Sequence, residues 1–151
     1  MIDTSDTSHD THDRVATLIF EPSCTKILIG RAPNRPAKPF NWDIVGKGHI
    51  EFNSDTKETC VREVYEESNI VISNPEDLIF LGKVKYRGGY LFVYSYVLES
   101  IPTDIRCNCE FEWYGKMLPE FKEFKWVTLD EAKTYLYKGL VEALFSLDIL
   151  K

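Results

Sequence analysis

The pattern of hydrophobic and polar positions divides the chain into short apolar or alternating runs that end at turn residues. Such runs predict β-strands at residues 15–20, 26–30, 42–45, 78–86, 90–98 and 124–127. Arg87-Gly88-Gly89 lies between two of these runs and is typical of a hairpin turn. The prolines within residues 32–39 predict a loop. Residues 100–122 show little regularity, so we expect a long connection there.

Two segments carry the start signals of helices. Asp55 followed by Glu58 fits a capping box and predicts a helix that begins near residue 56 and ends at Asn69. Thr128 followed by Glu131 fits a second capping box, and we expect its helix to break at residue 139 and resume over residues 140–147. Strands before and after helices favour an α/β fold in which a mixed β-sheet lies between helices on both faces.

Composition narrows the class of protein. A chain of 151 residues with 44% hydrophobic residues is long enough for one domain with its own core. We assign residues 14–151 to that domain and the polar residues 1–13 to a flexible tail. No apolar run is long enough to cross a bilayer, and no signal-peptide pattern precedes the domain, so we expect a cytoplasmic protein without a membrane partner. The net charge of −6 argues against non-specific coating of nucleic acid.

The four cysteines do not form the repeated pairs of a zinc site. Only Cys107 and Cys109 are closely spaced, as Cys107-Asn108-Cys109. We interpret them as two unrelated thiols.

Three carboxylates share one side of the first predicted helix. Glu63, Glu66 and Glu67 have the spacing i, i+3 and i+4, which places them on a common face, and we expect that face to point outward. The opposite side, which we expect to pack on the sheet, carries Val61, Val64, Tyr65 and Ser68. Like charges at this spacing repel one another, and a hard cation such as Mg²⁺ relieves the repulsion. The cluster therefore indicates a metal site.

The residues upstream make this indication specific, because residues 48–70 resemble the Nudix box. That motif is a glycine, five residues, Glu, seven residues, and then Arg-Glu-apolar-x-Glu-Glu-x-Gly-apolar. The positions that match are Gly48, Arg62, Glu63, Val64, Glu66, Glu67 and Ile70. Two positions depart from it: Ser54 replaces Glu and Asn69 replaces Gly. Ser54 removes a carboxylate, for which Glu51 or Asp55 is a nearby substitute.

The resemblance implies a Nudix-like α/β/α sandwich and a metal-dependent pyrophosphohydrolase. Glu63, Glu66 and Glu67 would bind Mg²⁺ or Mn²⁺, with Glu66 and Glu67 serving catalysis and Arg62 organising the carboxylates. Bound cations neutralise the diphosphate and lower the pKa of a bound water. Members of the family often take a further base from a loop outside the box. Glu120 and Glu123 lie where such a base is expected, and we assign Glu123.

The substrate is suggested by the loop before the helix. Lys47-Gly48-His49-Ile50-Glu51 is similar to the run in asymmetric dinucleoside tetraphosphate hydrolases, although those usually have Pro where this chain has Gly46. Lys47 and His49 would then contact distal phosphates, with Arg87 as a further phosphate contact. The aromatic residues that we consider for stacking on a base are Trp42, Tyr86, Tyr90 and Tyr114.

The sequence is compatible with three functional interpretations. The first is a hydrolase of a dinucleoside polyphosphate such as diadenosine tetraphosphate, with a small nucleotide as its partner. The second is an enzyme that acts on RNA 5′ ends, nucleoside triphosphates or nucleotide sugars, because residues 62–67 also resemble the mRNA-decapping subgroup. The third is a Nudix-fold binding module that has lost turnover, for which Ser54 is the argument.

Overall fold

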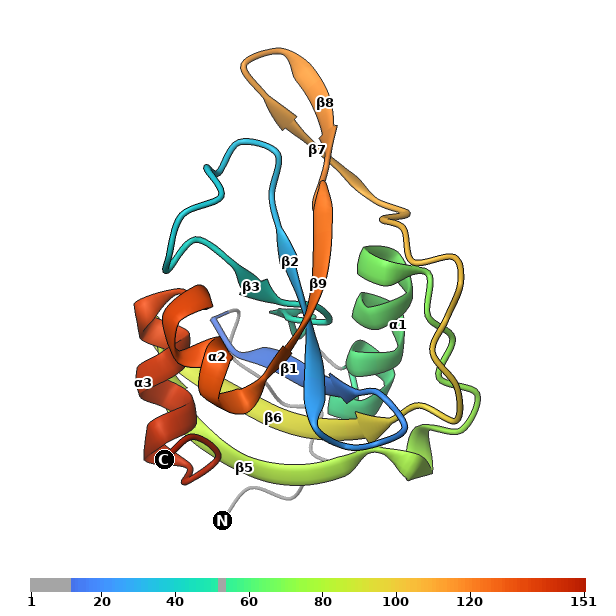
Figure 1. The fold of residues 1–151 in the computed structure, drawn as a ribbon, viewed down its shortest axis with the longest axis vertical. Coiled ribbons are helices and arrows are strands. Elements are labelled where there is room, and N and C mark those ends of the chain that lie inside the picture. The colour runs from blue at the N-terminus through green and yellow to red at the C-terminus, as the bar shows by residue number, and fades with distance from the viewer. Residues whose placement is uncertain (1–11, 52–53) are drawn as a thin grey trace.

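The computed structural model describes residues 12–51 and 54–151, and a mixed β-sheet lies at the centre of this part of the chain (Figure 1). The seven strands of the sheet are β1 (Arg14–Phe20), β2 (Lys26–Arg31), β3 (Asp43–Ile44), β4 (Gly48–His49), β5 (Ile79–Tyr86), β6 (Gly89–Val97) and β9 (Glu123–Thr128). The order β3-β2-β1-β6-β5 forms its path, while β4 pairs with β1 and β9 pairs with β2. β1 and β6 are parallel and the other pairs are antiparallel. The predicted mixed sheet is confirmed.

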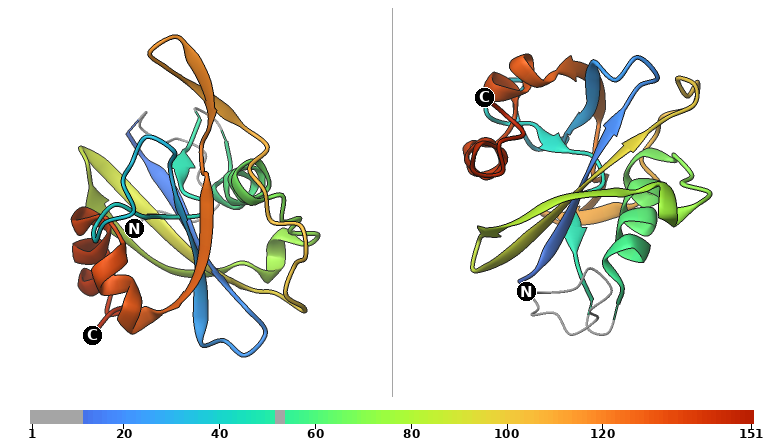
Figure 2. Two further views of the ribbon diagram at one scale, coloured as in Figure 1. Left: turned by 45° about the horizontal axis from the view of Figure 1, so that its top comes forward. Right: turned by 90° about the horizontal axis from the view of Figure 1, so that it is seen from below.

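Helices cover both faces of the sheet, as Figure 2 shows in the view from below. Alternate residues of a strand point to opposite faces, so Ala16 and Leu18 of β1 join one core cluster while Val15 and Ile19 join the other. The first cluster lies under α2 (Leu129–Tyr135) and α3 (Lys138–Ser146), and the second lies under α1 (Thr56–Ser68). This is the α/β/α sandwich expected from the sequence.

The first helix begins and ends where the sequence predicts. Asp55 is its N-cap, and Asn69 ends it in the left-handed conformation at φ 67°, with its N–H donating to the Tyr65 carbonyl. The predicted capping box between Asp55 and Glu58 is wrong, because the Asp55 side chain makes no capping hydrogen bond. The first turn is held instead by the Asp55 carbonyl, which accepts hydrogen bonds from the amide and the hydroxyl of Thr59.

The C-terminal helices break three residues earlier than predicted. Thr128 and Glu131 form the expected capping box at the start of α2. The break comes at Leu136 because the chain there pairs with Trp42, whose amide donates to the Tyr135 carbonyl and whose carbonyl accepts from the Tyr137 amide. The residue predicted to break the helix, at position 139, lies inside α3.

The segment predicted as an irregular connection, residues 100–122, contains a hairpin. Its strands are β7 (Glu110–Trp113) and β8 (Lys116–Pro119), and we call this hairpin the β7–β8 arm. Tyr114 at φ 50° and Gly115 at φ 78° form a two-residue turn of the kind that suits the twist of paired strands. The arm projects from the sheet at the top of Figure 1, and its base leads through residues 120–122 into β9.

The expected tail, residues 1–13, lies almost entirely outside the described residues. Asp13 is described and buried: its carboxylate accepts a hydrogen bond from the Tyr90 amide and its carbonyl accepts one from Ile50. Asp13 is thus anchored to the start of the sheet. Within residues 12–51 and 54–151, no helix is both long and apolar enough to span a membrane.

Candidate active site

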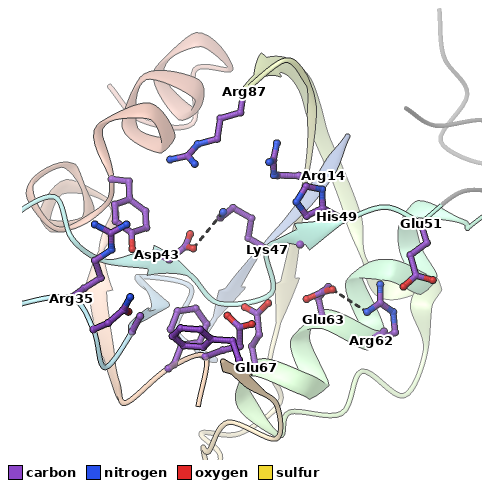
Figure 3. Close-up of a pocket in the computed structure, with 17 residues that line it drawn as sticks. Arg14, Arg35, Asp43, Lys47, His49, Glu51, Arg62, Glu63, Glu67 and Arg87 are labelled. Atoms are coloured by element: carbon purple, nitrogen blue, oxygen red, sulfur yellow. Dashed lines mark hydrogen bonds and ion pairs between the residues drawn. The ribbon is translucent and has the colours of Figure 1, made fainter. Parts of the chain in front are cut away.

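A cavity of about 590 Å³ opens between α1, the N-terminal end of β1 and the base of the β7–β8 arm (Figure 3). Most of the predicted site residues line it. Those residues are Lys47, His49, Arg62, Glu63, Glu67 and Arg87. The structure therefore brings the β5–β6 turn, which is distant in the sequence, to the Nudix-like helix and the loop before it.

Two glycines bring the loop at residues 45–48 directly against α1. Gly46 has φ +92°, a conformation that favours glycine, and its amide donates a 2.9 Å hydrogen bond to Oε1 of Glu67. A Cβ at Gly48 would lie 2.2 Å from Cδ of Glu63. Any other residue at position 48 would collide with that carboxylate. The glycine of the motif thus allows β4 to approach α1 closely, and a larger residue would force the Glu63 carboxylate to shift.

Glu67 does not point outward as the helix periodicity predicts. It is only 5% exposed, whereas Tyr65, expected to pack on the sheet, is 47% exposed. The reason is that α1 turns its Glu67 side toward the Gly46 loop, where a backbone amide receives the carboxylate. Burial, and then the hydrogen bond and charge of Glu63, raise the pKa of Glu67 well above its ordinary value. The nearby charge of Glu63 therefore disfavours ionisation of Glu67.

Arg62 organises the neighbouring carboxylates. Its Nη1 lies 3.0 Å from Oε1 of Glu63 and 3.3 Å from Oε1 of Glu66. Glu66 is partly exposed and is not among the residues that line the cavity, and Arg62 links it to Glu63.

The opposite wall of the cavity is basic. Figure 3 shows Arg14, Lys47, His49 and Arg87 grouped across from Glu63 and Glu67. Lys47 forms an ion pair with Asp43 at 3.4 Å. Burial alone would lower the pKa of Lys47, but the neighbouring Asp43 and then Tyr86 outweigh this and raise it. Lys47 is therefore charged at neutral pH.

A tyrosine supports this basic wall. The Arg14, Lys47 and Arg87 side chains all lie within 5.5–5.8 Å of the centre of the Tyr86 ring, at cation–π distance. The Tyr86 hydroxyl is buried and has no hydrogen-bond partner among the described residues. The ring thus offsets part of the repulsion between three cations that gather in one place.

The two loop glutamates considered as a base lie in different surroundings. Glu120 lines the cavity, where desolvation followed by the negative charges of Glu63 and Asp43 raises its pKa. Glu123, the residue assigned from the sequence, is not among the lining residues. Its carboxylate pairs with Arg31 at 2.9 Å on the neighbouring strand. A base must face the cavity, and Glu120 does so whereas Glu123 does not line it.

Several lining residues were not anticipated from the sequence. Asp43 carried a weak signal, since it is an acidic residue inside an otherwise apolar strand. Arg14 and Arg35 stand in unremarkable contexts, a strand start and a proline-rich loop, and carried none. The aromatic residues that line the cavity are Phe111, Phe121 and Tyr137. Two of the aromatic residues considered for stacking, Trp42 and Tyr86, are buried in the core instead.

Comparison of the sequence with models of known protein families identifies the family of this chain. The family model of the NUDIX domain matches residues 10–146, so the chain belongs to the Nudix family. It is a Nudix hydrolase, an enzyme that cleaves the pyrophosphate linkage in nucleoside diphosphate compounds. Comparison with the sequences of curated proteins gives no match.

Solved structures show the same fold at low sequence identity. The MutT protein of Methanosarcina mazei Go1 is 19% identical, with a TM-score of 0.61 over 91% of this chain and 92% of that one. A Caenorhabditis elegans Ap4A hydrolase in a binary complex is 19% identical, with a TM-score of 0.59 over 90% and 96%. The NUDIX domain of Shewanella oneidensis NrtR, complexed with ADP ribose, is 17% identical, with a TM-score of 0.57 over 91% and 88%.

Nudix hydrolases generally use divalent metal ions, and the acidic wall fits such an ion in the chemistry of its donors. Glu63 and Glu67 offer the hard oxygen atoms that such a cation prefers, and the charge of Glu63 favours a positive charge at Glu67. In residues 12–51 and 54–151, no three acidic, His or Cys side chains already stand as a metal-binding group. Ser54 does not line the cavity, whereas Glu51 does (Figure 3).

The raised pKa of Glu67 predicts how stability depends on pH. A carboxyl group whose pKa is raised on folding stabilises the fold fully below its unfolded pKa, and this contribution is lost as pH rises through the folded pKa. We expect the melting temperature in chelator to fall as pH rises above the ordinary pKa of a glutamate, more steeply for wild type than for Glu67→Gln. Saturating Mg²⁺ should flatten the wild-type curve, because the cation replaces the proton. If the melting temperatures of wild type and Glu67→Gln fell equally with pH in chelator, the raised pKa of Glu67 would be contradicted.

Proposed function

We propose that this Nudix hydrolase acts on dinucleoside polyphosphates, such as diadenosine tetraphosphate, with Mg²⁺ or Mn²⁺. The observation that carries the proposal is the division of one cavity into an acidic wall and a basic wall. The acidic wall holds Glu63, Glu67 and Glu120, and the basic wall holds a group of cations. A substrate with a long phosphate chain uses both walls at once, whereas a diphosphate occupies little more than the acidic wall.

Glu63 and Glu67 of the acidic wall would hold the divalent cation, together with Glu66, which lies outside the cavity lining and pairs with Arg62. When bound, the cation supplies charge neutralisation and a water of lowered pKa. Arg62 keeps Glu63 and Glu66 in place through its two ion pairs. Glu120 accepts the proton of the attacking water, a role that suits a carboxyl group whose pKa is raised toward neutrality.

On the basic wall, the phosphates beyond the cleaved linkage would meet the four cationic or polar side chains Arg14, Lys47, His49 and Arg87. Arginine and lysine bind phosphate oxygens through charge-assisted hydrogen bonds. The cavity volume of about 590 Å³ lies within the range of ordinary ligand sites. Phe111, at the start of the β7–β8 arm, offers an aromatic surface for a nucleobase.

Similar structures are consistent with this substrate class without deciding it. The Caenorhabditis elegans neighbour is an Ap4A hydrolase, and the Shewanella oneidensis neighbour binds ADP ribose. The number of cations on the basic wall is what favours the longer substrate here. The cytoplasmic location inferred from the sequence stays a prediction.

Replacing both Lys47 and His49 by Ala tests the role of the basic wall. One lost charge-assisted hydrogen bond is worth about 1.5–3 kcal/mol, or about tenfold to a hundredfold, so kcat/KM for diadenosine tetraphosphate should fall by about a hundredfold or more when both are lost. ADP-ribose, whose two phosphates reach less far, should lose less. Steady-state kinetics with both substrates at saturating Mg²⁺ measure the difference.

The control is Lys47→Arg, which keeps the positive charge beside Asp43 and should retain the preference for the longer substrate. Equal losses on the two substrates in the double variant would mean that the loop only shapes the metal side. The proposal of a dinucleoside polyphosphate substrate would then lose its main support.

A further inference from the structure

Cys107 and Cys109 lie together beside the active site, although the sequence suggested two unrelated thiols. Their Sγ atoms are 3.5 Å apart, and both side chains are partly buried. The two other cysteines differ: Cys24 is exposed in the β1–β2 turn, and Cys60 is a buried residue of α1 in the core. All four are free thiols. Of the four, only Cys107 and Cys109 lie close enough to react with each other.

The segment that holds this pair clamps the C-terminal end of the catalytic helix. The Asn108 amide donates a 2.7 Å hydrogen bond to the Glu66 carbonyl. Its side-chain amide donates to the Tyr65 carbonyl at 3.1 Å and to Oδ1 of Asn69 at 2.9 Å. The Cys107 thiol also reaches the Glu66 carbonyl. These contacts involve the turn of α1 that carries Glu66 and Glu67.

The same pair adjoins the base of the β7–β8 arm. The Cys109 carbonyl accepts a 3.2 Å hydrogen bond from the Glu120 amide, just before β7 begins at Glu110. Cys107 and Cys109 therefore lie between the helix that carries the metal-binding glutamates and the residue that we assign as the base. A change in the geometry of this pair would therefore displace both the end of α1 and Glu120.

We propose that Cys107 and Cys109 are a dithiol site that a peroxide oxidises to a disulfide, and that this oxidation slows hydrolysis. No third His, Cys or acidic side chain completes a metal-binding group with them among the described residues, which argues against a metal site. The reaction needs only two thiols at close range, which the structure provides.

The chemistry is balanced by one molecule of hydrogen peroxide. One sulfur attacks a peroxide oxygen, the O–O bond breaks, and a sulfenic acid and one water form. The second thiol attacks the sulfenic sulfur, an S–S bond forms, and the hydroxyl leaves as a second water. The two cysteines together lose two electrons and two protons, and the peroxide gains them.

Forming the bond requires movement at Asn108. The sulfurs must approach from 3.5 Å to the length of about 2.05 Å of a disulfide, which draws Cys107 and Cys109 together around Asn108. Because Asn108 holds the end of α1, its displacement shifts Glu66 and Glu67. A misplacement of about 1 Å costs a reaction about a hundredfold, so we expect a loss between about tenfold and about a hundredfold.

The test uses the full chain with Cys24→Ser, which removes the exposed competing thiol. After limited treatment with hydrogen peroxide, peptide mass analysis should show the loss of two hydrogen atoms in the peptide that contains Cys107 and Cys109. Amide hydrogen exchange at residues 66–69 should accelerate. Hydrolysis of diadenosine tetraphosphate with Mg²⁺ should fall, and dithiothreitol should restore all three properties.

The matched controls are Cys107→Ser and Cys109→Ser in the same background. Each should keep the untreated activity, form no such disulfide and retain its activity under the treatment that inhibits the parent. Thiols that stay reduced or gain oxygen without forming the bond would overturn the proposal, as would a disulfide that leaves activity and exchange unchanged. The effect on activity rests on the proposed substrate, whereas the mass and exchange readouts do not, so the two failures are distinguishable.

Discussion

Glu67→Gln is expected to lower kcat by at least about a hundredfold at saturating Mg²⁺, which corresponds to about 2.7 kcal/mol or more. The substitution removes the negative charge of a residue that we propose as a metal ligand but keeps nearly the same shape. The glutamine carbonyl oxygen can still accept the hydrogen bond that the Gly46 amide donates to Glu67. The variant should therefore fold, and in chelator at neutral pH it should melt no lower than wild type, because a buried like charge is gone.

The matched control is Glu58→Gln, the same change at an exposed position of the first turn of α1. Its turnover should equal that of wild type. Retention by Glu67→Gln of more than about a tenth of the wild-type activity, a deficit below about 1.4 kcal/mol, would show that Glu67 is not a principal ligand.

Glu120→Gln is the second change with a large expected effect. General base catalysis contributes about a hundredfold to ten-thousandfold, so kcat should fall by a factor in that range while the metal dependence stays unchanged. The amide cannot accept the proton of the attacking water. Steady-state kinetics across a titration of Mg²⁺ measure both quantities.

Glu123→Gln is the comparison that separates the two loop glutamates. Glu123 pairs with Arg31 near the surface, so the variant should lose at most about 1 kcal/mol of stability and keep its turnover. A larger loss of turnover in Glu123→Gln than in Glu120→Gln would return the role of base to the residue assigned from the sequence.

Local patterns predicted much of the fold because the cause of each element lies close by in the sequence. β1 alternates between two cores through neighbouring residues, and α1 ends at Asn69 because asparagine tolerates the left-handed conformation. The break between α2 and α3 has a distant cause, the pairing of Leu136 with Trp42, and sequence periodicity could not reveal it. The turn at Tyr114-Gly115 was a local signal that was missed.

In the candidate site, too, the sequence predicted what depends on neighbouring residues and missed what depends on distant ones. The Nudix-like spacing located the carboxylates on α1, because their positions relative to one another follow from helix geometry. It did not predict that Glu67 is buried, since that depends on the approach of the Gly46 loop. Nor did it predict the contribution of Arg14, which reaches the cavity only because β1 pairs with β4. Residues that meet through tertiary pairing leave little trace in the local pattern.

The most direct test of the central claim is product analysis for the wild-type protein with diadenosine tetraphosphate and Mg²⁺. The same assay should include ADP-ribose, a nucleoside triphosphate and capped RNA at equal concentrations. We predict that the tetraphosphate has the highest kcat/KM and is cleaved asymmetrically into ATP and AMP, and that Glu67→Gln slows this reaction by at least about a hundredfold. A higher kcat/KM for ADP-ribose, the triphosphate or capped RNA would contradict the proposed substrate class.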